Sequence, residues 1–209
     1  FNNYHTTRDD EKSQILSWIS PLESWRRHSD VARTRAEGVG DWVLEDREFQ
    51  AWRQGGSDVI LFCSGAPGAG KTFICSLIVD TLCDETSGSS VAIGCLYCDY
   101  RGQNEQSPAV MIGGLLRQFA TALPETPEAI SEAFQAAKSH LGGRAPQLAK
   151  IMELFPGVLA SFQQVFICVD ALDELLVEYK VEFMRSLRQI LEGSPHAKLF
   201  LTGRPHIQS

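Results

Sequence analysis

The sequence predicts an α/β fold with a mainly parallel central sheet. Four short apolar runs have the length and composition of buried strands, and they cover residues 59–63, 91–97, 165–169 and 197–201. Segments with apolar residues at helical spacing separate these runs, and strands that alternate with helices pair in parallel. Since parallel strands bring their carboxyl ends to one edge of a sheet, we expect the residues that follow the runs to share one crevice.

The turn after the first run fits the phosphate-binding pattern G-x-x-x-x-G-K-[ST] at every fixed position. It reads Gly65-Ala66-Pro67-Gly68-Ala69-Gly70-Lys71-Thr72, and a helical pattern continues from it through Leu82. Glycine takes positive φ at little cost and leaves room for a phosphate, so the amides of such a loop can point inward. We expect Lys71 to reach the β and γ phosphates, the Thr72 hydroxyl to bind Mg²⁺, and the nucleotide contacts to extend to Phe73. The alternative is a glycine-rich turn with no ligand.

Composition bounds the classes of function. A chain of 209 residues with 44% hydrophobic and 22% charged residues suits one sizeable soluble α/β domain. The net charge of -7 argues against a nucleic-acid surface. No apolar run approaches the ~20 residues of a membrane span, and the polar amino end is no signal peptide. We therefore expect a cytoplasmic protein without a membrane span and, because the chain begins at Phe1, a fragment of a longer one.

The six cysteines mostly fall in apolar strand or helix patterns, which suits a reducing compartment. Cys95 and Cys98 have the spacing of half a zinc site. No second pair of cysteines or histidines follows at the required spacing, so we interpret both as small apolar residues and not as metal ligands.

Residues 1–56 are predicted to be a helical segment that leads into a nucleotide-binding core, residues 57–209. Residues 1–8 are polar and are expected to be mobile. The first helix can be capped by Asp9 or Asp10. Its apolar stripe consists of Ile15, Leu16, Trp18 and Ile19.

Residues 22–36 place Trp25 among several basic side chains, and a solvated helix face is the favoured interpretation. The basic residues are Arg26, Arg27, His28, Arg33 and Arg35. Residues 38–42 are typical of a turn. A short helix over 45–54 is expected to bury two aromatic side chains before a break at 55–57. These aromatic residues are Phe49 and Trp52.

Beyond the loop helix, residues 84–90 are typical of a polar link, and a turn over 104–108 starts a further helix. The core face of that helix is predicted to contain Val110, Met111, Leu115, Leu116 and Phe119. Two more helical patterns cover 127–141 and 146–162, and Pro156 is a candidate interruption of the second.

The apolar run at 165–169 ends on Asp170, and Asp173 and Glu174 follow closely. In phosphate-loop enzymes an acid at such a strand end lies beside the loop and holds Mg²⁺. Three uncompensated carboxylates at one strand tip would repel one another unless a cation or water is held there. The alternative assigns these acids as caps of the helix predicted over 176–192.

The last apolar run leads into Thr202, and Arg204 lies two residues further on. Both are expected to face the crevice that holds the loop and Asp170. There Arg204 could contact the γ phosphate or the attacking water, whereas the alternative is a solvent-exposed arginine.

Four blocks together resemble the NACHT branch of the STAND signal-transduction NTPases, in particular the fungal NLR-like and nephrocystin-like domains that precede ankyrin or WD repeats. The blocks are Gly38-Val39-Gly40-Asp41-Trp42, residues 65–72, Tyr97-Cys98-Asp99-Tyr100-Arg101, and Val169-Asp170-Ala171-Leu172-Asp173-Glu174 with Thr202-Gly203-Arg204-Pro205. The most discriminating block has a small residue, Ala171, beside the strand-end aspartate and further acids in place of a directly adjacent glutamate. The winged-helix segment and repeats of full-length members have no counterpart in this sequence.

The resemblance implies a three-layer phosphate-loop NTPase fold of the ASCE type. The implied strand order is the loop strand, the Thr202 strand, the Asp170 strand and the Val91 strand. The implied roles are Lys71 on phosphate, Thr72 and Asp170 at Mg²⁺, Glu174 or Asp173 polarising water, Arg204 as the sensor, and Val39 and Gly40 near the base.

Together the motifs and the resemblance predict Mg²⁺-dependent binding and slow hydrolysis of a nucleoside triphosphate. The expected role is a switch in signal transduction by a fungal NLR-like protein of innate immunity, with self-association of the full-length protein. No base-reading motif such as NKxD is visible, which favours ATP over GTP, and the bound nucleotide can also be the diphosphate. An interaction scaffold that binds nucleotide without turnover is the alternative. A small-molecule kinase is disfavoured, because neither an acceptor pocket nor an arginine-bearing lid is found.

Overall fold

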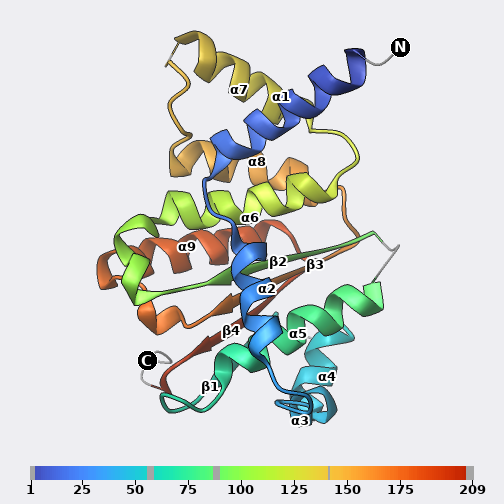
Figure 1. Ribbon diagram of the computed structural model, residues 1–209, viewed down its shortest axis with the longest axis vertical. Coiled ribbons are helices and arrows are strands. Elements are labelled where there is room, and N and C mark those ends of the chain that lie inside the picture. The colour runs from blue at the N-terminus through green and yellow to red at the C-terminus, as the bar shows by residue number, and fades with distance from the viewer. Residues whose placement is uncertain (1–2, 56–58, 87–89, 141, 206–209) are drawn as a thin grey trace.

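The computed structural model describes residues 3–55, 59–86, 90–140 and 142–205 (Figure 1). Within these residues, four parallel strands form one sheet in the order β1-β4-β3-β2. The strands are β1 Ile60–Ser64, β2 Val91–Tyr97, β3 Gln164–Asp170 and β4 Ala197–Gly203. The four predicted strands and their predicted order are therefore confirmed.

Helices cover both faces of this sheet (Figure 1). One face carries α5 Lys71–Thr86 together with α2 Ser24–Thr34, α3 Trp42–Glu45 and α4 Arg47–Arg53. The other face carries α6 Pro108–Ala122 and α9 Val177–Gly193, beyond which lie α1 Asn3–Ile19, α7 Glu128–His140 and α8 Leu148–Leu159. The 3₁₀ turns η1 Tyr100–Glu105 and η2 Leu172–Glu174 follow β2 and β3.

The central strand β3 shows how the two faces share the sheet. Val165, Ile167 and Val169 pack in the core beneath α6 and α9. Phe166 and Cys168 pack in the other core, beneath α5. Successive side chains of a strand point to opposite faces, so covering both faces requires a continuous apolar run. Burial on both sides fixes the end of β3, and with it the position of the residues that follow.

The first helix is longer than the sequence predicted. α1 already begins at Asn3, so the expectation of a mobile segment over residues 1–8 and a helix start at Asp9 or Asp10 is wrong for the described residues. No proline or glycine interrupts this segment, and the helix therefore continues toward the N-terminus. The buried residues of its predicted stripe are Ile15, Trp18 and Ile19.

The helix predicted over 45–54 corresponds to α4, which begins at Arg47, and a separate short helix, α3, precedes it and ends at Glu45. Asp46 separates the two, because its backbone is extended, with φ -65° and ψ 136°. Its carboxylate accepts hydrogen bonds from the amides of Glu48 and Phe49, so it caps the N-terminus of α4. Phe49 and Trp52 are buried as predicted, with exposed fractions of 0% and 1%.

α8 continues through Pro156, so the candidate interruption of this helix does not occur. Proline removes one helical hydrogen bond. The turn is nevertheless retained, because Phe155, Val158 and Leu159 around it are buried in the core. The preceding turn at Gly142 and Gly143 has positive φ at both glycines, as a helix end requires.

Three predictions extend beyond the described residues. Of the predicted break at 55–57, the structure describes only Gly55. Of the predicted link at 84–90, it describes all residues except 87–89. The helix predicted to end at Leu141 is described as far as His140. The loop helix α5 reaches Thr86, four residues beyond the predicted end at Leu82.

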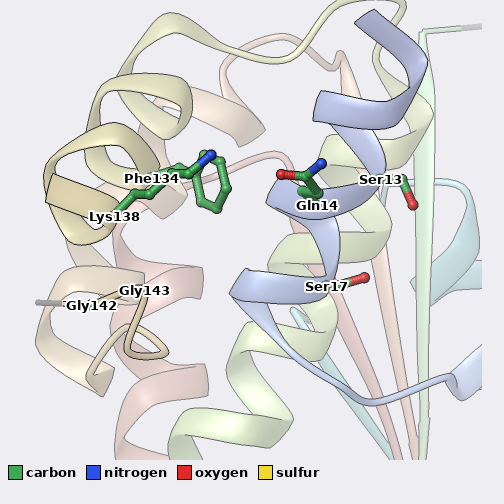
Figure 2. A pocket seen from close by; sticks show the side chains of 7 residues that line it. All are labelled: Ser13, Gln14, Ser17, Phe134, Lys138, Gly142 and Gly143. Atoms are coloured by element: carbon green, nitrogen blue, oxygen red, sulfur yellow. The ribbon is translucent and has the colours of Figure 1, made fainter. Parts of the chain in front are cut away.

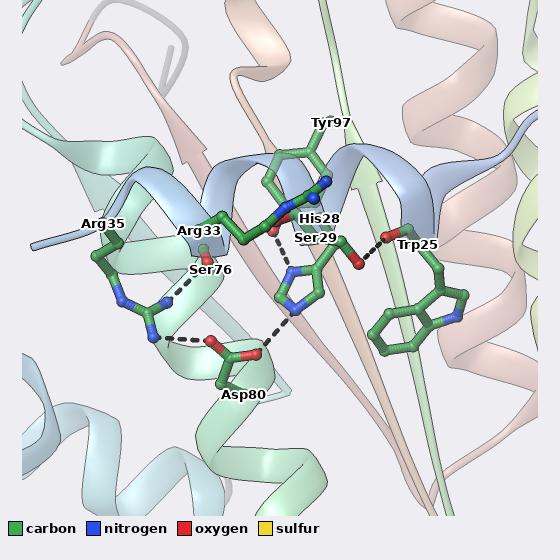
Figure 3. A network of polar contacts seen from close by, with 8 residues as sticks. All are labelled: Trp25, His28, Ser29, Arg33, Arg35, Ser76, Asp80 and Tyr97. Atoms are coloured by element: carbon green, nitrogen blue, oxygen red, sulfur yellow. Dashed lines mark hydrogen bonds and ion pairs between the residues drawn. The ribbon is translucent and has the colours of Figure 1, made fainter.

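A polar network fixes α2 against α5 and β2 (Figure 3). The buried ring of His28 lies between two partners, with Nδ1 2.8 Å from the Tyr97 hydroxyl and Nε2 2.9 Å from Asp80 Oδ1. Arg35 donates to Asp80 Oδ2 and to the Ser76 hydroxyl, both at 2.7 Å. Because Ser76 and Asp80 lie on α5, the helix that begins at the phosphate-binding pattern is joined directly to the N-terminal helices.

This network corrects the predicted solvated face of α2. The prediction is right for Arg26, Arg27 and Arg33, which are exposed. It is wrong for His28, which is buried, and for Arg35, whose side chain is only 16% exposed. Residues on the side of α2 that faces α5 contact that helix. A run of basic residues in the sequence does not show which of them lie on this side.

Candidate functional site

A cleft of about 310 Å³ lies where the carboxyl ends of β3 and β4 meet the N-terminus of α5. Its lining consists of Pro67, Gly68, Ala69, Gly70, Lys71, Thr72, Phe73, Asp170, Ala171, Asp173, Glu174 and Arg204. The structure thus brings together most residues that the sequence assigned to a nucleotide site. Four assigned residues, Gly65, Ala66, Val39 and Gly40, lie outside this lining.

The loop over 65–72 has the backbone that its glycines predict. Gly68 and Gly70 have φ of 79° and 83°, in the left-handed region that glycine adopts without strain. The Lys71 ammonium donates to the carbonyl oxygens of Gly65 at 2.8 Å and Ala66 at 3.0 Å. Gly65 and Ala66 therefore act on the site through Lys71, whose side chain they hold over the loop at the edge of the cleft.

Asp170 ends β3 with its carboxylate almost completely buried, and the residue is 2% exposed. The Thr202 hydroxyl donates to its Oδ1 at 2.6 Å, and the Thr72 hydroxyl lies close enough to favour the ionised carboxylate. Burial raises the pKa of Asp170 above its ordinary value, although the two hydroxyls and the Lys71 charge oppose the rise. A carboxylate and a hydroxyl that meet beside a phosphate-binding loop are oxygen donors of the kind Mg²⁺ prefers.

The chain reverses sharply at Ala171, where φ is 54° and ψ is 45°. Its amide donates to the Thr202 hydroxyl oxygen at 2.9 Å, which fixes the turn to β4. The left-handed conformation is costly for residues with a Cβ, and most of all for β-branched ones, which explains a small residue at this position. The turn leads directly into η2, which returns Asp173 and Glu174 to the cleft.

Asp173 is paired with Arg204 across the cleft. The guanidinium Nε lies 2.8 Å from Asp173 Oδ2, and the exposed side-chain fractions are 8% for Asp173 and 49% for Arg204. Arg204 thus lies at the rim of the cleft and is neither fully exposed nor free. None of the three carboxylates is without a partner, because the Thr202 hydroxyl bonds to the first acid, Arg204 pairs with the second, and a backbone amide bonds to the third.

That amide belongs to Tyr100, which donates to Glu174 Oε2 at 3.1 Å. Partial burial raises the pKa of Glu174, and the hydrogen bond from the Tyr100 amide opposes the rise. Sequence reasoning gave no role to Tyr100, although the residue lies in one of the blocks that carried the family resemblance. Its contact with Glu174 joins residues 74 positions apart, so only the paired ends of β2 and β3 reveal it.

Gly40 lies against the side of α5. A Cβ at Gly40 would stand 3.3 Å from Ile74 Cγ1 and 3.4 Å from Leu77 Cδ2, and φ at Gly40 is 91°. Glycine is therefore required here both for space and for backbone conformation. Val39 is 37% exposed, so this turn presents an apolar side chain beside the helix that begins at the loop.

A second hollow of about 640 Å³ lies between α1 and α7 (Figure 2). It is lined by Ser13, Gln14, Ser17, Phe134, Lys138, Gly142 and Gly143. Figure 2 shows Phe134 and Lys138 of α7 facing Gln14 of α1. This lining contains no carboxylate, imidazole or thiol.

The described part of the chain contains no group of three or more His, Cys, Asp or Glu side chains arranged to hold a metal ion. No disulfide joins any of the six cysteines, all of which lie within the described residues. Along the same residues, no helix combines the length and apolarity needed to cross a membrane.

Comparison with known proteins identifies relatives of this chain. The family model described as Nephrocystin 3, N-terminal, matches residues 38–204. The chain is also 22% identical, over 139 residues, to the vegetative incompatibility protein HET-E-1 of Podospora anserina. That similarity covers 66% of this chain and 10% of the relative, so the chain spans about a tenth of the length of this curated relative.

Proposed function

This chain belongs to the family of nephrocystin 3 N-terminal domains, and from that premise we propose that it binds a nucleoside triphosphate with Mg²⁺, hydrolyses it slowly, and serves as the switch of an NLR-like signalling protein. One observation carries this proposal. The cleft gathers the phosphate-binding loop, the buried strand-end Asp170 and the Arg204–Asp173 ion pair around one volume. ATP is the favoured nucleotide, with GTP as the other candidate.

The loop would bind the phosphates through its amides and through Lys71. In the structure described here the Lys71 ammonium bonds two loop carbonyls, so it is already held at the mouth of the cleft. Thr72 and Asp170 fit Mg²⁺ as oxygen donors, and these two residues would hold it. The bound ion would supply neutralisation of charge between the β and γ phosphates.

Glu174 would orient the attacking water and accept its proton. A bond then forms between the water oxygen and the γ phosphorus while the bond from that phosphorus to the bridging oxygen breaks. Asp173 has its carboxylate engaged by Arg204, whereas Glu174 is held by an uncharged amide. Arg204 would give up its ion pair with Asp173 to bind the γ phosphate. This proposed exchange is the reason for assigning Arg204 as the sensor.

The remaining assignments follow from the same proposal. The fold would be a three-layer phosphate-loop NTPase of the ASCE type, with residues 1–56 as a helical segment and 57–209 as the core. Val39 and Gly40 would lie near the nucleotide base, supported by the packing of Gly40 beside the first turns of α5. The full-length protein would self-associate in its triphosphate state.

Phosphate release in a single turnover tests this function. The purified chain is mixed with a limiting amount of radiolabelled ATP or GTP, with and without Mg²⁺, and both binding and released phosphate are followed. We expect Glu174→Gln to retain binding and to slow release by roughly 10² or more, because it keeps the shape of the base and removes its charge. Asp173→Asn is the matched control.

Each outcome separates the proposal from its alternative. Binding by the wild-type chain without any phosphate release would identify an interaction scaffold that holds nucleotide as a structural ligand. If Asp173→Asn slows phosphate release while Glu174→Gln releases phosphate at the wild-type rate, the roles of the two acids are exchanged. Normal hydrolysis by both variants would leave these residues as caps and refute the catalytic assignment.

A further inference from the structure

The turn that follows β2 touches the cleft through the bond between the Tyr100 amide and Glu174. We infer that residues 99–106 are a positioning element, which fixes the carboxylate of Glu174 for the reaction proposed above. This inference rests on the proposed function and extends it to a segment outside the phosphate loop and the strand-end acids. Tyr100 acts through Glu174 and contacts no reacting atom.

The turn is held rigidly enough to serve this purpose. Gln106 is 8% exposed, and its side-chain amide accepts from the Asp99 amide at 3.2 Å and donates to the Asp99 carbonyl at 3.3 Å. The Asp99 carboxylate caps η1 by accepting from the Arg101 amide at 2.9 Å. The Cys98 amide donates to the Asp170 carbonyl at 3.1 Å, which ties the exit of β2 to the end of β3.

The bond uses one oxygen of Glu174 and leaves the other available. Oε2 accepts from the Tyr100 amide, and within the described residues Oε1 has no hydrogen-bond partner. As the first residue of η1, Tyr100 has an amide with no acceptor inside its own turn, so Glu174 satisfies it. This bond gives the Tyr100 amide an acceptor and restricts the orientation of the Glu174 carboxylate.

Glu174 lies between the nucleotide cleft and a neighbouring hollow. That hollow has a volume of about 240 Å³ and is lined by Tyr100, Gln103, Asp173, Glu174, Leu175 and Arg204. Asp173, Glu174 and Arg204 border both spaces. The carboxylate that the Tyr100 amide anchors thus borders both the proposed nucleotide site and a space large enough for water, as a water-orienting base requires.

The Tyr100 amide also opposes protonation of this base. Burial raises the pKa of Glu174, and the amide is the largest influence that lowers it again. A donor to the carboxylate favours the ionised form, which is the form that accepts a proton from water.

Replacing Tyr100 by proline deletes the anchoring amide with little other change. The preceding Asp99 is extended, with φ -140° and ψ 120°, as a residue before proline must be. Proline is also favoured at the first position of a helical turn, where the missing amide has no partner in the turn. The Tyr100 side chain is largely exposed, and Tyr100→Ala is the matched control, because it removes the same ring and keeps the amide.

We expect Tyr100→Pro to lower the single-turnover rate of phosphate release by roughly 10-fold to 100-fold relative to Tyr100→Ala, because misplacing a catalytic group by about 1 Å has such an effect. The dissociation constant for the non-hydrolysable triphosphate analogue should change by less than about two-fold, since the loop, Lys71 and Asp170 are untouched. A purely structural role would instead weaken binding and stability together. Equal rates for the two variants overturn the inference.

A second measurement tests the inference even if the chain hydrolyses no nucleotide. Amide hydrogen exchange of the intact chain, read by NMR, compares the Tyr100 amide in the wild type and in Glu174→Ala. We expect exchange at Tyr100 to accelerate about ten-fold or more in the variant, while amides of β3 stay protected. Unchanged exchange would refute the anchor. Absent hydrolysis with accelerated exchange would refute the proposed function and leave the anchor in place.

Discussion

Replacing Thr202 by valine tests how the buried end of β3 is held. The Thr202 hydroxyl is completely buried, donates to Asp170 Oδ1 at 2.6 Å, and accepts from the Ala171 amide at 2.9 Å. Valine keeps the branched shape and nearly the same volume. The substitution therefore removes two hydrogen bonds without opening a cavity, and leaves the Ala171 amide and one Asp170 oxygen without that partner.

The magnitude follows from what each group loses. A buried polar group left without its partner costs about 1–3 kcal/mol. The Thr72 hydroxyl and the Lys71 charge still favour the ionised Asp170 carboxylate, so the lower end of that range applies to it, whereas the full range applies to the Ala171 amide. We expect Thr202→Val to lower the free energy of unfolding by about 2–4 kcal/mol. For a domain of this size the melting temperature should fall by roughly 5–12 °C.

The assay is urea and thermal unfolding without nucleotide or Mg²⁺. Thr202→Ser is the control, because it keeps the hydroxyl and loses one methyl group, at a cost of about 1 kcal/mol. A Thr202→Val chain as stable as Thr202→Ser would show that the hydroxyl does not hold Asp170. A cycle with Asp170→Asn should further show non-additive losses, since the two residues are in contact.

Three other predictions address the loop, the turn and the base. Lys71→Ala should abolish triphosphate binding in calorimetric titration. The melting temperature should stay within a few degrees of the wild-type value, because the partners of Lys71 are loop carbonyls. Wild-type affinity for the triphosphate would refute the loop assignment. Ala171→Val should destabilise the chain by about 1–2 kcal/mol or more in urea unfolding, whereas Ala171→Gly should stay within about 1 kcal/mol, because only glycine relieves the left-handed backbone. Burial raises the pKa of Glu174, so the ionised base forms only at higher pH. The acid limb of the plot of hydrolysis rate against pH should therefore lie above 4.5, the ordinary pKa of glutamate. This limb should vanish in Glu174→Gln.

The sheet could be predicted from sequence because its strands are buried on both faces. Alternating residues of β3 pack in opposite cores, so the apolar run has no polar interruption and its end at Asp170 is sharp. Helix ends were predicted less well, since they depend on local capping. The carboxylate of Asp46 caps α4, so that this helix begins at Arg47 and not at the predicted Glu45, and α1 extends to Asn3 through residues with no apolar pattern.

Membership of the family was also predictable, because the nephrocystin-like resemblance rests on short blocks that each carry a local backbone requirement. Gly40 needs space beside Ile74 and a positive φ, and Ala171 needs a small side chain in the left-handed region. The family match over residues 38–204 confirms this resemblance. Contacts such as His28 with Asp80 could not be predicted, because they join segments through the packed fold and leave no spacing pattern in the sequence.

The structure distinguishes the three acids at the end of β3 in a way that the sequence does not. The sequence separates Asp170 from the other two acids by its place at the strand end, but either Asp173 or Glu174 could polarise water. Their partners distinguish them: Asp170 is held by hydroxyls deep in the fold, Asp173 by the Arg204 guanidinium, and Glu174 by an uncharged amide at the cleft. A base must keep an oxygen free for water and must not be neutralised by a fixed cation. Of the three, Glu174 alone meets both conditions among the described residues, so the contrast between Glu174→Gln and Asp173→Asn tests this partner assignment as directly as it tests catalysis.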